Sequence, residues 1–288
     1  MAEKPDYTDF DWTFLIKDRE AKWKVMMDFV DERGWKKIPL RTSGGFTSQL
    51  ILLPRQEEKR GIFIVCAGGG FRFKSSNEAL PVAEFFHGKG LNAAILDYHV
   101  DRDGGGDEVL IKAGEDGLEA VRQLRAHADE LGILGDHIAI GGFSAGGMTS
   151  GYAATHFDAG DPARGIAPSR PDAALILYGS MSRAGIRENV GTYDPAEQRR
   201  RAALDIAGSI SEDTPPMFLF QTHKDDPRHA LQLGFALASR GVPFEIHTFE
   251  QGDHGWGLYD GGDPDSPLVP HTKLWGEIAA DWLVMRGF

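Results

Sequence analysis

The stretch Gly142-Phe143-Ser144-Ala145-Gly146 decides the fold, because it fits the pattern G-x-S-x-G and its flanks indicate one local structure. The run at 137–141 is short and mostly apolar, which predicts a buried strand. Residues 147–155 are small and compatible with a helix. A strand that turns sharply into a helix around one serine exposes the hydroxyl of Ser144 at a strained apex. The alternative interpretation is an ordinary strand-to-helix turn in which the serine is only a cap.

Outward from this turn, apolar runs alternate with helical patterns through the rest of the chain. The runs that predict strands lie at 61–66, 91–98, 173–178, 216–221 and 244–249. Such a β-α-β rhythm implies the α/β class, with a mostly parallel central sheet and helices on both faces. We expect a single domain over 1–288, with an N-terminal helix and strand extension over about 1–60 and a helical excursion over about 180–213.

Composition narrows the class of partner. The chain carries 43 acidic against 31 basic side chains, a formal net charge of -12, which argues against nucleic acid and anionic membrane surfaces as partners. A neutral small-molecule substrate fits this charge better. Cys66 is the only cysteine, so no intramolecular disulfide is predicted and Cys66 is interpreted as an inert core thiol.

The N-terminus is polar and lacks the apolar core of a signal peptide, and no segment is long and apolar enough to span a membrane. We therefore expect a cytoplasmic protein.

Ser144 needs a base and an acid to become a nucleophile, because a serine hydroxyl reacts poorly at neutral pH. His254 is the candidate base, since it lies between glycines on a loop just after the predicted strand 244–249. Two neighbouring carboxylates, Asp225 and Asp226, follow the strand at 216–221. The distance from the strand end favours Asp225. The proline that follows Asp226 favours Asp226 only through the resemblance described below, because in related enzymes a proline commonly follows the catalytic acid. We prefer Asp226 as the acid and keep Asp225 as the alternative.

A glycine-rich loop after the strand 61–66 is the candidate oxyanion hole. Consecutive glycines let the backbone approach a bound carbonyl closely, so the N–H groups of Gly69, Gly70 and Phe71 are candidates, together with that of Ala145 after the nucleophile. The loop lacks the spacing of a phosphate-binding or dinucleotide-binding motif. No His/Cys cluster has metal-ligand spacing, so we expect neither cofactor nor metal.

With these residues in view, the chain resembles the α/β-hydrolase superfamily over about residues 60–288. Within it, the chain is most similar to acetyl-esterase and xylan-esterase-like enzymes, relatives of the dienelactone hydrolase and prolyl oligopeptidase groups. The segments that support this closer resemblance are 66–71 (CAGGGF), 96–100 (LDYHV), 142–147 (GFSAGG), 214–219 (TPPMFL), 241–245 (GVPFE) and 254–258 (HGWGL). The resemblance implies an enzyme that removes acetyl or other short acyl groups, often from sugars, without a cofactor.

Together these inferences predict a serine carboxylesterase that acts on a small-molecule ester through an acyl-enzyme. Ser144 would attack, His254 would carry the proton, and Asp226 or Asp225 would orient His254. The substrate we expect is a small acetylated sugar or oligosaccharide. The sequence is also compatible with a homo-oligomer. The alternatives are an amide or formamide hydrolase, a small peptidase with the same triad, and a non-catalytic binding protein on the hydrolase scaffold.

Overall fold

One eight-stranded sheet organises the molecule, and most of it is parallel. The computed structural model describes residues 12–41, 47–103, 106–179 and 205–288. The strands are β1 (Lys37–Arg41), β2 (Thr47–Leu52), β3 (Arg60–Cys66), β4 (Asn92–Asp97), β5 (Ile133–Phe143), β6 (Ala173–Leu177), β7 (Met217–Thr222) and β8 (Phe244–Phe249). Their order is β1-β2-β4-β3-β5-β6-β7-β8. The pairs β1–β2 and β2–β4 are antiparallel and every later pair is parallel, which confirms the predicted mostly parallel sheet.

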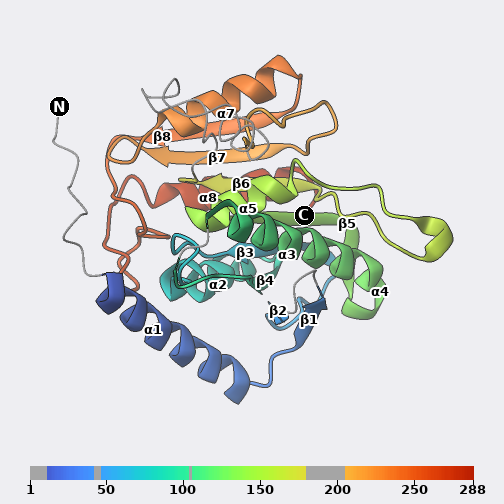
Figure 1. Cartoon of the computed structure of the whole chain (residues 1–288), viewed down its shortest axis with the longest axis horizontal. Coiled ribbons are helices and arrows are strands. Elements are labelled where there is room, and N and C mark those ends of the chain that lie inside the picture. Colours follow the sequence, from blue (N-terminus) through green and yellow to red (C-terminus); the bar gives the residue numbers. More distant parts are fainter. Residues whose placement is uncertain (1–11, 42–46, 104–105, 180–204) are drawn as a thin grey trace.

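Helices cover both faces of the sheet (Figure 1). The α-helices are α1 (Trp12–Glu32), α2 (Leu80–Gly88), α3 (Gly106–Ala126), α4 (Ala128–Leu131), α5 (Ala145–Ala153), α7 (Arg228–Ser239) and α8 (Leu274–Met285), and the short 3₁₀ helices are η1 (Ser76–Glu78) and η2 (Pro162–Arg164). Side chains of α3, α5 and α7 pack into the core on one face, and those of α1, α2 and α8 into the core on the other. The α/β class with two helical layers is therefore confirmed.

Strand β3 has no polar side chain after Arg60, and its position in the sheet explains why. Successive side chains of a strand point to opposite faces, and here both faces are covered by helices. Ile62 and Ile64 accordingly lie in the core with α3 and α5, while Phe63 and Val65 lie in the core with α2 and α8. The strand ends at Cys66, directly before the glycine-rich loop, so the buried sheet fixes where that loop begins.

The N-terminal segment is part of this architecture, because β1 and β2 extend the same sheet. The helical excursion expected over 180–213 lies mostly outside the described residues, and the part that is described, 205–213, forms turns. None of the helices in the described ranges has both the length and the apolar character that crossing a bilayer requires.

Candidate active site

The turn around Ser144 has the strained backbone that the sequence predicts. Ser144 joins β5 to α5 with φ 52° and ψ −114°, a conformation that non-glycine residues rarely adopt. Its N–H donates to the carbonyl of Leu177 at 3.0 Å, which anchors the turn to β6. A Cβ on Gly142 or Gly146 would come within 2.2 Å or 2.0 Å of the Cys66 carbonyl oxygen. Both positions therefore require glycine, and the crowding around them holds the serine in its strained conformation.

His254 lies between Ser144 and a carboxylate. Its Nε2 is 2.8 Å from Ser144 Oγ, and its Nδ1 is 2.5 Å from Asp225 Oδ2. In the tautomer that suits catalysis, the Nδ1–H group donates to Asp225, and Nε2 accepts the serine proton. The ring also packs against Tyr178, with ring centroids 4.9 Å apart. The structure thus brings Ser144 and His254 together, as the sequence analysis predicts for a nucleophile and its base.

The preference for Asp226 as the acid is wrong, because the carboxylate that contacts His254 belongs to Asp225. Asp226 instead pairs with the Arg228 guanidinium, 2.6 Å away, and accepts the backbone N–H of Arg228 at 3.1 Å. The hydrogen bond from Arg228 lowers the pKa of the Asp226 carboxyl, against the effect of its partial burial. The reason is local: Pro227 precedes the first residue of α7, so the carboxylate before it serves the start of that helix.

Electrostatics around His254 favour its protonated form. Partial desolvation lowers the pKa of the imidazole, but the hydrogen bond and charge of Asp225, together with the charge of Glu78, outweigh it and hold the pKa above its usual value. A base whose charged form is stabilised in this way accepts the serine proton more readily.

The glycine-rich loop turns beside Ser144. Gly69 and Gly70 line the same cavity as Ser144 and have φ values of 138° and 60°, and a Cβ on Gly69 would lie 2.0 Å from the Phe73 carbonyl oxygen. Phe71 is placed differently, because its side chain is buried with its ring 6.3 Å from that of Tyr98. Phe71 is not among the described residues that line this cavity, so Gly69 and Gly70 are the better-placed candidates for oxyanion donors.

Ala145 offers the second kind of donor. It is the first residue of α5, and the first N–H groups of an α-helix have no partner within the helix. Because Ala145 follows the nucleophile directly, its N–H lies on the same turn as Ser144. This arrangement suits an anion that develops on an atom attacked by Ser144 Oγ.

A cavity of about 520 Å³ opens at Ser144 and His254. Its wall includes Leu15 and Arg19 of α1, which lie far from the site in the sequence. Arg19 and Lys22 both donate to Asp265 Oδ2, the latter at 2.7 Å, so ion pairs hold the helix against the opposite rim. The sequence does not indicate this wall, because the residue pattern of an N-terminal helix does not show which of its side chains line a cavity. The remaining lining includes Trp256, Phe73, Ser75, Pro264 and Pro267.

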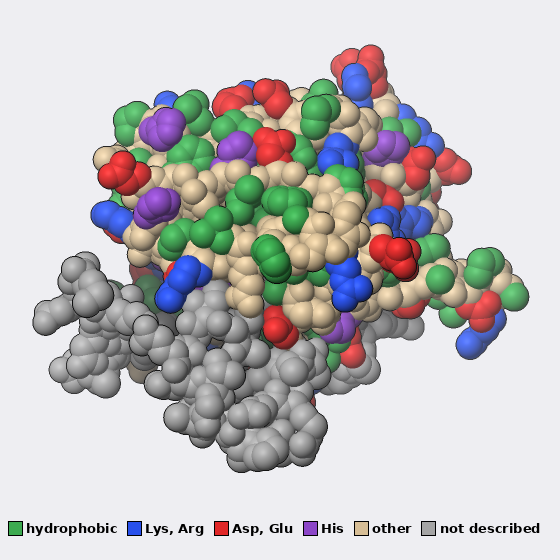
Figure 2. All heavy atoms as spheres, turned by 90° about the horizontal axis from the view of Figure 1, so that it is seen from above, with side chains coloured by type: hydrophobic (Ala, Val, Ile, Leu, Met, Phe, Trp, Pro, Cys, Tyr) green, Lys and Arg blue, Asp and Glu red, His purple; other side chains and the backbone are tan. Residues whose placement is uncertain are grey.

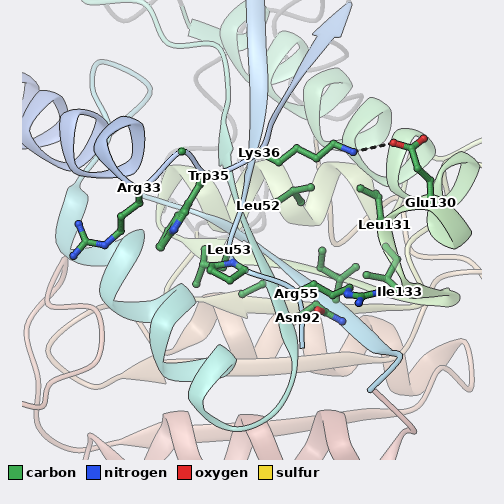
Figure 3. Close-up of a pocket in the computed structure, with 14 residues that line it drawn as sticks. Arg33, Trp35, Lys36, Leu52, Leu53, Arg55, Asn92, Glu130, Leu131 and Ile133 are labelled. Carbon is green, nitrogen blue, oxygen red and sulfur yellow. Dashed lines mark hydrogen bonds and ion pairs between the residues drawn. The ribbon is translucent and has the colours of Figure 1, made fainter. Parts of the chain in front are cut away.

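A second cavity, of about 400 Å³, lies at the opposite edge of the sheet, where β3, β4 and β5 begin (Figure 3). Leu53 and Ile133 contribute to its apolar lining, Trp35 stands at one side, and Lys36 and Glu130 form an ion pair of 3.0 Å at its rim. Neither serine, histidine nor cysteine is among its described lining residues.

Surface charge on the outer face near α7 is mixed, with acidic and basic side chains interspersed (Figure 2). Across the described ranges, no group of three or more His, Cys, Asp and Glu side chains is arranged to hold a metal ion. Burial raises the pKa of the Cys66 thiol to about 12, in keeping with an inert core residue.

A protein-family model and a curated relative both match this chain. The prolyl oligopeptidase family model matches residues 112–262. An endo-1,4-beta-xylanase B from Butyrivibrio fibrisolvens is 30% identical over 275 residues, covering 87% of this chain, and the chain spans only 41% of that relative's length.

Solved structures agree on the fold. An acetyl ester-xyloside bifunctional hydrolase from Caldicellulosiruptor lactoaceticus is 26% identical with a TM-score of 0.73, over 87% of this chain and 96% of the other. An alpha/beta hydrolase from a Medee basin deep-sea metagenome is 26% identical (TM-score 0.64; 87% and 97% covered). A thermophilic esterase from Thermogutta terrifontis, solved with propionate bound, is 25% identical (TM-score 0.68; 88% and 95% covered). Since the family model matches more than half of the chain, and these solved structures share its overall fold, the protein belongs to the prolyl oligopeptidase family and has the α/β-hydrolase fold.

Proposed function

We propose that this protein is a serine carboxylesterase that removes acetyl or other short acyl groups through an acyl-enzyme. The observation that carries the proposal is the hydrogen-bonded series Ser144–His254–Asp225 at a strained turn that opens into a cavity. A nucleophile, its base and an orienting carboxylate within hydrogen-bond reach are what acyl transfer requires.

The reaction begins when Ser144 Oγ attacks the ester carbonyl carbon and its proton passes to His254 Nε2. The carbonyl oxygen becomes an oxyanion, which the N–H groups of Ala145 and of Gly69 or Gly70 stabilise. The bond to the alcohol oxygen then breaks, and the imidazolium gives its proton to that oxygen. Water repeats the sequence with His254 as base, which releases the carboxylic acid and restores the serine hydroxyl.

For the substrate we propose a small, uncharged, acetylated sugar or oligosaccharide. The cavity volume of about 520 Å³ suits a small ligand, and Trp256 offers a flat apolar surface with a polar edge. Two similar proteins support this class, since one is described as an acetyl ester-xyloside hydrolase and another as a xylanase. The propionate held by a third supports a short acyl group.

The test is a chromogenic ester series from acetyl to octanoyl, followed by acetylated xylo-oligosaccharides, with Ser144→Ala measured in parallel. We expect rapid release of acetate, a steep decline beyond butyryl, and loss of turnover in Ser144→Ala with unchanged folding. Equal turnover in Ser144→Ala would exclude the proposed nucleophile.

Peptide or amide cleavage is the second candidate function, because the matching family model carries the name of a peptidase family. The same three residues serve both chemistries, and the substrate alone distinguishes them. Matched acetyl esters and acetyl amides of one chromogenic group decide between them. Faster amide than ester cleavage would favour the peptidase.

A further inference from the structure

Glu78 is a buried carboxyl beside the candidate active site to which the steps above give no role. It lies at the end of η1, is 1% exposed, and lines the cavity that contains Ser144 and His254. A carboxyl is costly to bury unless hydrogen bonds or charges compensate for the lost water. Its partners therefore indicate what it does.

One oxygen of Glu78 holds the start of the glycine-rich loop. The Gly68 N–H donates to Glu78 Oε2 at 2.7 Å. The carbonyl of the same peptide unit, that of Ala67, accepts the Tyr98 hydroxyl at 2.6 Å. Hydrogen bonds therefore fix both the carbonyl and the N–H of the Ala67–Gly68 peptide unit, which precedes Gly69 in the loop. Because glycines have little conformational preference of their own, the orientation of the following N–H groups depends on such external contacts.

The other oxygen holds the loop that bears the base. The Tyr178 hydroxyl donates to Glu78 Oε1 at 2.5 Å and accepts the Gly257 N–H at 3.0 Å. Since the hydroxyl has one proton and Gly257 is a donor, that proton is directed to Glu78. Both carboxyl oxygens are therefore acceptors. Gly257 lies three residues after His254, and the Tyr178 ring packs against the imidazole.

Glu78 also contributes charge. Burial holds the pKa of its carboxyl above the usual value, because the hydrogen bonds from Tyr178 and Gly68 and the charges of His254 and Arg19, which lower the pKa, offset the effect of burial only in part. Within the described residues, several titratable groups surround His254 and Glu78. They are Asp225 after β7, Tyr178 after β6, Tyr98 after β4, Arg19 on α1, and Asp253, Tyr259 and Asp265 on the loops after β8, with Lys224 paired to Asp253. An anion at Glu78 favours the imidazolium that forms during acyl transfer.

We propose that Glu78 is a positioning residue that orients the oxyanion loop through Gly68, holds the His254 loop through Tyr178, and stabilises the imidazolium of His254 by its charge. This proposal rests on the proposed function, because it assigns Glu78 a part in that chemistry. Its effect falls on species that exist only during the reaction, so it predicts a change in kcat more than in KM.

The first test is Glu78→Gln, which keeps the size of the side chain but turns one of the two acceptors into a donor and removes the charge. We expect kcat for an acetyl ester to fall roughly tenfold to a hundredfold, less than the ~10²–10³ of a lost oxyanion donor, with KM changed by less than about threefold. Glu84→Gln, at an exposed position on α2, is the matched control and should behave as wild type. Wild-type kcat in folded Glu78→Gln would overturn the proposal.

The second test needs no substrate. NMR titration of the His254 ring should give a lower pKa in Glu78→Gln than in wild type, by roughly half a unit or more, since an opposite charge nearby is lost. The acidic limb of kcat/KM should move to lower pH by the same amount. An unchanged His254 pKa together with unchanged kcat would refute the role.

Tyr178→Phe covers the case in which Glu78→Gln does not fold. It removes the link to Gly257 and one hydrogen bond that lowers the pKa of Glu78 and so favours its charged form. Both kcat and the His254 pKa should therefore fall, and wild-type values would overturn the proposal. If the wild-type protein hydrolyses no ester, the proposed function fails, whereas the His254 titration still decides whether Glu78 supports the imidazolium.

Discussion

The two cavities at opposite edges of the sheet are similar in size and differ in chemistry. One, of about 520 Å³, lies where β3 and β5 end and is lined by Ser144, His254 and Glu78. The other, of about 400 Å³, lies where β3, β4 and β5 begin and combines an apolar lining with the exposed pair Lys36–Glu130. Size alone therefore does not make an active site.

The difference follows from how parallel strands are connected. Loops that leave the carboxyl ends of neighbouring strands converge, so polar groups from distant parts of the sequence meet there. Ser144 follows β5, Asp225 follows β7 and His254 follows β8, and all three meet at one edge. At the other edge, the segments that enter the strands bring mainly side chains that pack.

The largest effect should come from the acid of the first cavity. Asp225→Asn should lower kcat about 10³–10⁴-fold, because the amide favours the wrong tautomer of His254 and cannot balance its positive charge. Asp226→Asn, one residue away, should change kcat by less than about threefold, since Asp226 faces Arg228. Steady-state kinetics of both variants check this, and the opposite ranking would restore Asp226 as the acid.

The next effect concerns stability at the turn. Gly146→Ala places a Cβ 2.0 Å from the Cys66 carbonyl oxygen, so the free energy of unfolding should fall by about 3 kcal/mol or more. Gly88→Ala meets no atom within 4 Å at the end of α2 and should stabilise by about 0.5–1 kcal/mol. Denaturant unfolding measures both, and equal effects would mean that the turn at Ser144 is not tightly packed.

A smaller effect is expected in the pH profile. His254 must be neutral to act as base, and its pKa is raised above the ordinary 6.5, so kcat/KM should fall as pH drops through a value above 6.5. Asp225→Asn should move this limb to lower pH. The sign for stability is opposite, because a raised pKa in the folded state stabilises at low pH and that contribution is lost as pH rises. A limb clearly below 6.5 in wild type would contradict the electrostatic argument.

The smallest effect belongs to the second cavity. Lys36→Ala removes an ion pair whose side chains are 52% and 65% exposed, so the free energy of unfolding should change by less than about 1 kcal/mol, and kcat and KM should not change. Thermal unfolding and ester kinetics check this. A loss of turnover would show that the two edges of the sheet are coupled.

The fold class and the turn at Ser144 are predictable from the amino-acid sequence alone, because both depend on local patterns. Apolar runs such as 61–66 predict buried strands, and the glycines at 142 and 146 are required by contacts that any such turn makes. The base, His254, was also predictable, since few histidines follow a strand between glycines.

The choice between Asp225 and Asp226 depends on the folded chain, because adjacent residues on a loop point in different directions and the order of residues does not record those directions. The contribution of α1 to the cavity and the link from Glu78 through Tyr178 to the His254 loop likewise join segments about 80 to 250 residues apart. Such contacts depend on the packing of helices and loops around the sheet, which is a property of the folded chain as a whole.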